Sequence, residues 1–177
     1  LQKLQANNQA NLLGAVEVNP DRIAEIEKEF SIECQSSLEA FAGKARAAVI
    51  ATPTSTHRDI AIAAIANGMD VLIEKPIAST TEDAQAILDA ASQFGKLVQV
   101  GHTERFNPAI AAALPIANNP RYITAERLAP FSGRSTDVDV ILDLLIHDLD
   151  IVASLIPSPV KEVRAIGVPI LTNAIDM

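Results

Sequence analysis

The chain has 177 residues, 49% of them hydrophobic, which is enough for a sizeable apolar core in one or two domains. A formal net charge of −8 argues against nucleic acid or an anionic membrane as a partner, and no apolar run is long enough to span a bilayer. The single cysteine, Cys34, excludes an internal disulfide and favours a cytoplasmic location.

Residues 1–101 alternate between short apolar runs and amphipathic stretches of helical length. Asn19 and Pro20 are typical of a helix start, and Gly68 and Gly95 of helix ends. The pattern predicts a parallel sheet covered by helices on both faces. We expect strands at 12–18, 31–35, 46–53, 70–76 and 96–101, and helices at 1–11, 19–30, 37–43, 57–67 and 80–95.

Polar residues follow several of these apolar runs. Ligands of open parallel sheets bind outside the carboxyl ends of the strands, so residues there are candidates for a site. The alternative interpretation is that they are ordinary polar loop residues. The residues concerned are Glu17, Thr52, Pro53, Glu74, Lys75, Pro76 and His102.

The pattern of apolar and polar residues changes after Gly101. Residues 102–120 are punctuated by Pro and Asn, 121–131 alternate like a strand with one exposed face, 138–156 are strongly helical, and 160–171 are again strand-like. This organisation predicts the start of a second, α+β domain at residues 102–177, after a first domain at residues 1–101.

The helix expected from Val140 to Ile156 is apolar nearly all round, which predicts that it is buried. One narrow polar stripe runs along it, and there Asp143 lies one turn before His147, where its carboxylate can orient the imidazole and favour the protonated ring. Three interpretations stay open: a structural hydrogen-bond pair, a metal site that lacks a clear third ligand, and an acid/base catalyst. The stripe consists of Asp143, His147, Asp150 and Ser154.

Three stretches resemble, in order and spacing, the Gfo/Idh/MocA oxidoreductases: IATPTSTHRDIAIAAIANGMDVLIEKPIA, VGHTERFNPAI and LDLLIHDLDI. The resemblance implies a Rossmann-like doubly wound parallel sheet at 1–101, followed by the start of a C-terminal α/β domain with a large open sheet. It also implies an NAD cofactor. A carboxylate at Glu17 would repel the 2′-phosphate of NADP, whereas the nearby Arg22 leaves NADP open.

The resemblance assigns roles residue by residue. Lys75, Asp143 and His147 match the family's catalytic group, and no metal is implied. Arg105 and Asn107, together with His147, match a segment near the substrate. The residues that match cofactor-binding positions are Glu17, Thr52, Pro53, His57, Glu74 and Lys75.

The implied activity is hydride transfer between nicotinamide and a secondary alcohol of a sugar, cyclitol or nucleotide sugar, such as a nucleotide-linked amino sugar oxidised at its 3-hydroxyl. The alternatives are a non-catalytic cofactor-binding regulator and a scaffold of the same fold. A homo-oligomer, dimer or tetramer, is expected. Arg134, in the loop before the long helix, fits either an anionic substrate or a solvated loop.

The chain departs from the family pattern in one respect, because the Gly-rich strand–turn unit is missing. Such a turn places phosphates at a helix N-terminus, so without it we expect this stretch alone to be inactive. We interpret the sequence as a fragment and expect unpaired sheet edges.

Overall fold

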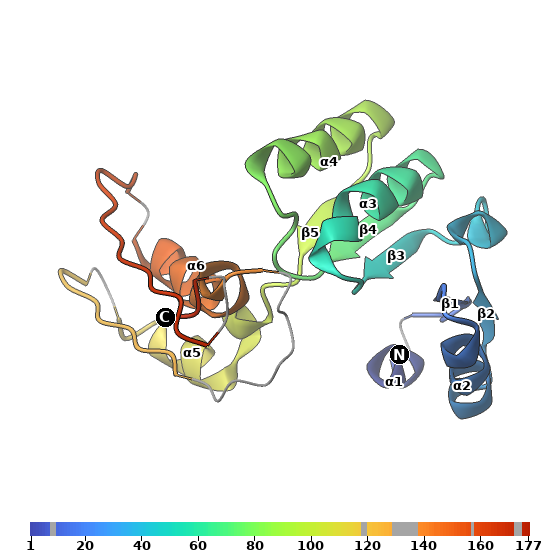
Figure 1. Ribbon diagram of the computed structural model, residues 1–177, viewed down its shortest axis with the longest axis horizontal. Coiled ribbons are helices and arrows are strands. Elements are labelled where there is room, and N and C mark those ends of the chain that lie inside the picture. Colours follow the sequence, from blue (N-terminus) through green and yellow to red (C-terminus); the bar gives the residue numbers. More distant parts are fainter. Residues whose placement is uncertain (8–9, 118–119, 129–137, 157, 172–174) are drawn as a thin grey trace.

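The computed structural model describes residues 1–7, 10–117, 120–128, 138–156, 158–171 and 175–177. None of the helices in these ranges has the length and apolar character needed to cross a membrane. Three 3₁₀ turns and one π-helical turn, η4, accompany the regular elements. In chain order the elements are α1 (Gln2–Gln5), β1 (Gly14–Val16), α2 (Pro20–Phe30), β2 (Glu33–Gln35), η1 (Leu38–Phe41), β3 (Ala47–Ile50), η2 (Thr54–Thr56), α3 (His57–Ala66), β4 (Asp70–Ile73), α4 (Thr81–Phe94), β5 (Val98–Val100), η3 (Thr103–Phe106), α5 (Pro108–Ala113), η4 (Ile141–Leu145) and α6 (Ile146–Leu155) (Figure 1).

All strand pairs in the described ranges are parallel, which confirms the α/β class predicted from the alternation. The strands form two sheets, one of β1 and β2 and one with the order β3-β4-β5 (Figure 1). A doubly wound sheet has the order 3-2-1-4-5-6, in which strand 1 joins the two halves. The observed strands follow that order if β2 and β1 take the places of strands 3 and 2, and β3, β4 and β5 those of strands 4, 5 and 6. No described strand takes the place of strand 1, between β1 and β3. Both strands therefore present an unpaired edge, as the sequence predicted.

Local signals in the sequence fix the helix ends. The side chain of Asn19 accepts hydrogen bonds from the first turn of α2, which begins at Pro20, and Thr80 caps α4 in the same way. Gly95 ends α4 with a positive φ of 63°. That left-handed conformation costs glycine little, so α4 ends where the sequence predicted.

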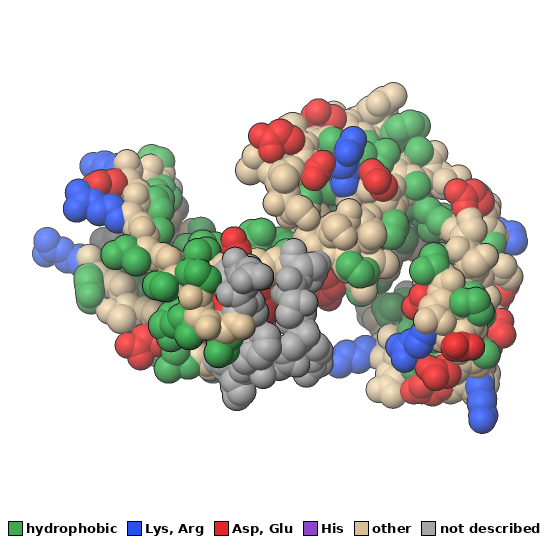
Figure 2. Space-filling model, viewed as in Figure 1, with side chains coloured by type: hydrophobic (Ala, Val, Ile, Leu, Met, Phe, Trp, Pro, Cys, Tyr) green, Lys and Arg blue, Asp and Glu red, His purple; other side chains and the backbone are tan. Residues whose placement is uncertain are grey.

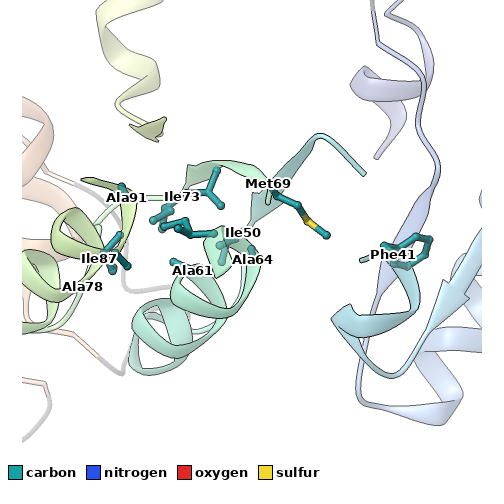
Figure 3. Packing of buried hydrophobic residues seen from close by; sticks show 12 residues of the cluster. Phe41, Ile50, Ala61, Ala64, Met69, Ile73, Ala78, Ile87 and Ala91 are labelled. Atoms are coloured by element: carbon teal, nitrogen blue, oxygen red, sulfur yellow. The ribbon is translucent and has the colours of Figure 1, made fainter. Parts of the chain in front are cut away.

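The main core lies between the β3-β4-β5 sheet and the helices α3 and α4, which pack side by side. Ile73 from β4, Ile65 from α3 and Ile87 from α4 are fully buried there (Figure 3). The helices that pack on these three strands, α3 and α4, lie on one face, and Val49 of β3, on the other face, is 49% exposed. Alternate residues of each strand point to opposite faces, so one face is buried and the other is open.

The part of the chain after β5 contains helices and irregular segments. The strands predicted at 121–131 and 160–171 are absent from the described residues, namely 121–128 and all of 160–171. Tyr122 and Ile166 are 85% and 96% exposed, and many apolar side chains lie on the surface of this part (Figure 2). A strand needs a neighbour to satisfy its backbone groups and cover its apolar face, and none is present here.

The long helix of the C-terminal part also differs from the prediction. It begins with the π-helical turn η4 and continues as α6, and neither contains a buried residue. Leu145 and Leu149 are 41% and 52% exposed. The prediction of a buried helix was wrong for the described residues, because no strand among them covers this helix.

Candidate active site

A cavity of about 230 Å³ opens at the carboxyl ends of β3 and β4. Parallel α/β sheets bind ligands at this end, because the loops that follow the strands converge there. Most of the predicted cofactor residues are among its lining, with Glu17 the exception. The lining residues are Ala51, Thr52, Pro53, Thr54, His57, Glu74 and Lys75.

Lys75 follows β4 and precedes Pro76, and the peptide bond between them is cis. Its ammonium group donates hydrogen bonds to the backbone oxygen of Asp143 at 2.7 Å and to the Oδ1 atom of the same residue at 2.9 Å. The two side chains are 19% and 30% exposed, so the pair is mostly shielded from water. Folding thus brings together two predicted catalytic residues that lie 68 positions apart in the sequence.

His147 lies in the first turn of α6, and its Nδ1 atom is buried with no hydrogen-bond partner among the described residues. The sequence predicted that Asp143 would orient this ring and favour its protonated form, and this is wrong. Asp143 binds Lys75 instead. The π-helical geometry of η4 also changes the stacking that an α-helix gives to residues four positions apart.

The electrostatics of His147 are opposite to the expected ones. Burial, followed by the nearby cations Lys75 and Arg127, lowers the pKa of the imidazole. A lowered pKa favours the neutral ring at neutral pH, and only the neutral ring has a nitrogen that can accept a proton. The site therefore holds His147 in the form that a general base requires.

Two ion pairs fasten α6 to the preceding segments. Arg105, predicted to lie near the substrate, donates two hydrogen bonds to Asp150 at 2.6 and 2.5 Å. Arg127 donates two to Asp148 at 3.0 and 2.8 Å. Sequence reasoning missed Arg127, because no local pattern identifies a partner 21 residues away.

The other predicted residues lie further from the cavity or have local roles. Glu17, at the end of β1, accepts hydrogen bonds from the backbone nitrogens of Val18 and Asn19. Asn107 caps α5 by accepting from the backbone nitrogen of Ala109. Arg134 lies outside the described residues. Within the described ranges no group of three or more His, Cys, Asp or Glu side chains is arranged to hold a metal ion.

Comparisons with known proteins show the family of the chain. The family model described as "Oxidoreductase family, NAD-binding Rossmann fold" (Gfo/Idh/MocA) matches residues 1–102. UDP-N-acetylglucosamine 3-dehydrogenase from Acidithiobacillus ferrooxidans is 41% identical over 169 residues, which cover 95% of this chain and 54% of that protein. The chain belongs to the Gfo/Idh/MocA oxidoreductase family.

Two further similarities concern another relative and a solved structure. The scyllo-inositol 2-dehydrogenase (NAD(+)) of Bacillus subtilis is 33% identical over 132 residues, which cover 68% of this chain and 38% of that protein. A solved structure of the Acidithiobacillus ferrooxidans enzyme superposes with a TM-score of 0.90 at 40% identity, over 99% of this chain and 57% of that one. The chain thus spans about half the length of the Acidithiobacillus ferrooxidans relative.

Proposed function

We propose that the protein to which this chain belongs is an NAD-dependent dehydrogenase that oxidises a secondary alcohol of a sugar, cyclitol or nucleotide sugar. The observation that carries the proposal is the contact between Lys75, beside the cavity, and Asp143, on the turn that leads into His147. This contact brings the cation of Lys75 and the neutral imidazole of His147 to the end of the sheet where ligands bind. A dehydrogenase needs both groups next to the alcohol oxygen.

The residues at the cavity fit the nicotinamide half of a dinucleotide. Thr52, Pro53 and Glu74 lie at the carboxyl ends of β3 and β4, on the walls of the space that a flat ring would enter. When bound, nicotinamide supplies the hydride chemistry, which no side chain can supply. Among the described residues no Gly-rich turn lies at this end of the sheets to hold the phosphates, so the residues present fit this half of the cofactor alone.

The proton chemistry belongs to His147 and Lys75. In the proposed direction of alcohol oxidation, neutral His147 accepts the hydroxyl proton. Lys75 donates a hydrogen bond to the same oxygen and stabilises the negative charge that develops on it. Asp143 holds the ammonium group of Lys75 in place through two contacts. This assignment differs from the sequence expectation, in which Asp143 acted on the imidazole.

Among the substrate classes we favour a nucleotide sugar. The relative named for UDP-N-acetylglucosamine matches 95% of the chain at 41% identity, whereas the scyllo-inositol enzyme matches 68% at 33%. The larger match includes the segments with Arg105, Asn107 and Arg127, which we propose to lie near the substrate. For the cofactor we propose NAD, because the carboxylate of Glu17 would repel a 2′-phosphate.

We also propose that the protein works in the cytoplasm as a homo-oligomer. The chain has one cysteine, Cys34, which is buried, and this composition is typical of a reducing compartment. The homo-oligomer is proposed from the resemblance to the family alone.

Fluorescence titration of the full-length protein with NADH and with NADPH tests the proposal, followed by turnover assays with UDP-N-acetylglucosamine and scyllo-inositol. The expected result is tighter binding of NADH than of NADPH and reduction of NAD with the nucleotide sugar. Binding without turnover of any alcohol would favour a regulator of the same fold. If the protein bound neither cofactor, that result would contradict the dehydrogenase proposal and favour a scaffold.

A further inference from the structure

His57 is the most deeply buried polar side chain in the described part of the chain, at 1% exposed. It is the first residue of α3, directly after the loop that follows β3. The sequence expectation gave it a cofactor-binding role. A ring so deeply buried has little surface left for a ligand, so its place in the cavity wall needs another explanation.

Both nitrogens of the His57 ring face backbone carbonyl oxygens. Nδ1 lies 2.9 Å from the oxygen of Pro76, and Nε2 lies 2.9 Å from the oxygen of Thr52. The first belongs to the loop that carries Lys75, and the second to the loop that follows β3. A single side chain therefore bridges the two loops that form the cavity.

The two contacts fix the ring between the loops. A carbonyl oxygen only accepts hydrogen bonds, so the ring is the donor to these loops. Which nitrogen donates depends on the tautomer, and each lies 2.9 Å from a carbonyl oxygen. A replacement that fills the space without donating would leave a buried carbonyl without a partner, which is unfavourable.

We propose that His57 is a positioning residue that clamps the Thr52 loop to the Pro76 loop through its two ring nitrogens, and thereby sets the place of Lys75. The clamp acts through the backbone, so His57 itself need not touch substrate or cofactor. The effect on turnover rests on the proposed dehydrogenase function, but the link between the loops does not.

The first test is amide hydrogen exchange in the full-length protein and in His57→Gln, whose shorter side chain cannot reach both carbonyl oxygens at once. We expect faster exchange than in the unmodified protein in at least one of the two loops, at 51–54 and 75–78. Unchanged exchange in both loops would overturn the proposal. This readout needs no substrate, so it stands apart from any failure of the proposed activity.

The second test compares His57→Phe, which fills the space without donating, with the control Arg58→Ala on the solvent side of the same helix. In His57→Phe we expect faster amide hydrogen exchange in both loops, at 51–54 and 75–78, and a fall in kcat on the order of a hundredfold from misplacement of Lys75. Arg58→Ala should change neither. Unchanged exchange in both loops of a folded His57→Phe protein would contradict the clamp. If His57→Phe does not fold, the exchange result on His57→Gln decides.

Discussion

Substitution of Asp143 gives the most direct view of how the site is held together. Asp143 accepts two hydrogen bonds from Lys75, one through its backbone oxygen at 2.7 Å and one through its carboxylate at 2.9 Å. Asp143→Asn keeps both oxygens and removes the negative charge. Asp143→Ala keeps only the backbone contact. The two variants therefore separate the charge from the hydrogen bond.

The expected losses follow from the strengths of these bonds. A hydrogen bond that involves a charged group contributes about 1.5–3 kcal/mol, and a neutral one about 0.5–1.5 kcal/mol. The pair is mostly shielded, with side chains 19% and 30% exposed, so these values need little reduction for solvent screening. Asp143→Ala should lose about 1.5–3 kcal/mol of transition-state stabilisation, which is roughly tenfold to a hundredfold in kcat. Asp143→Asn keeps a hydrogen bond from the charged ammonium and loses only the attraction between opposite charges, so its kcat should fall less than that of Asp143→Ala.

The assay is the initial rate of NAD reduction by the full-length protein, with NADH affinity measured in parallel by fluorescence. Asp139→Asn is the matched control, since Asp139 caps the same turn by accepting a hydrogen bond from the backbone nitrogen of Leu142 and makes no hydrogen bond with Lys75 among the described residues. We expect NADH affinity to stay within about twofold in all three variants, because Asp143 does not line the cavity. A kcat of Asp143→Ala equal to that of the unmodified protein would refute the reasoning.

Three further predictions concern α6 and the cofactor. Arg127→Gln removes a cation that lowers the pKa of His147 and leaves Asp148 without this partner. The pKa of His147 should therefore rise, and the acidic limb of the kcat/KM profile for alcohol oxidation should move to higher pH. The exposed control Arg164→Gln should leave the acidic limb in place. A limb that stays where it is would contradict this assignment of His147. A double-mutant cycle of Arg105→Gln and Asp150→Asn should give a coupling of about 1–2 kcal/mol in chemical unfolding at pH 7, reduced because Arg105 is half exposed. The hydrogen bond from Arg105 lowers the pKa of Asp150, so the coupling should be present above the ordinary aspartate pKa and fade as pH falls through the lowered one; a coupling that grows in acid would be inconsistent with this. Finally, Glu17→Ser should reduce the preference for NADH over NADPH in fluorescence titration, and an unchanged ratio would exclude Glu17 from the cofactor site.

Much of the structure of residues 1–101 could be predicted because its signals are local. Asn19 and Pro20 start α2, and Gly95 ends α4, through contacts within a few residues. The alternation of strands and helices was enough to predict parallel pairing. The same reasoning could not show that α3 and α4 lie on one face of the β3-β4-β5 sheet, because alternation does not say which face each helix covers.

The site was predictable only in part. Resemblance placed Lys75, Asp143 and His147 in one group, and the structure brings Lys75 and Asp143 into contact. Helical spacing then suggested the wrong partner for Asp143, because it assumed regular α-helical geometry where η4 is π-helical. Arg127 gave no signal at all, since its partner lies in a distant part of the chain.

The prediction of strands at 121–131 and 160–171 was wrong in the described residues for a related reason. Their alternating pattern describes a surface that could pack, but a strand forms only when a neighbour pairs with its backbone. In the described residues of this chain those neighbours are absent, and side chains such as Ile166 remain exposed.

The measurement that tests the central claim most directly is the comparison of Lys75→Met with the unmodified full-length protein, by NAD reduction with UDP-N-acetylglucosamine and by NADH fluorescence. If Lys75 stabilises the charge that develops on the substrate oxygen, kcat should fall by a factor on the order of a hundred to a thousand while NADH affinity changes little. Equal losses of turnover and NADH affinity, or a variant that turns over normally, would contradict the account.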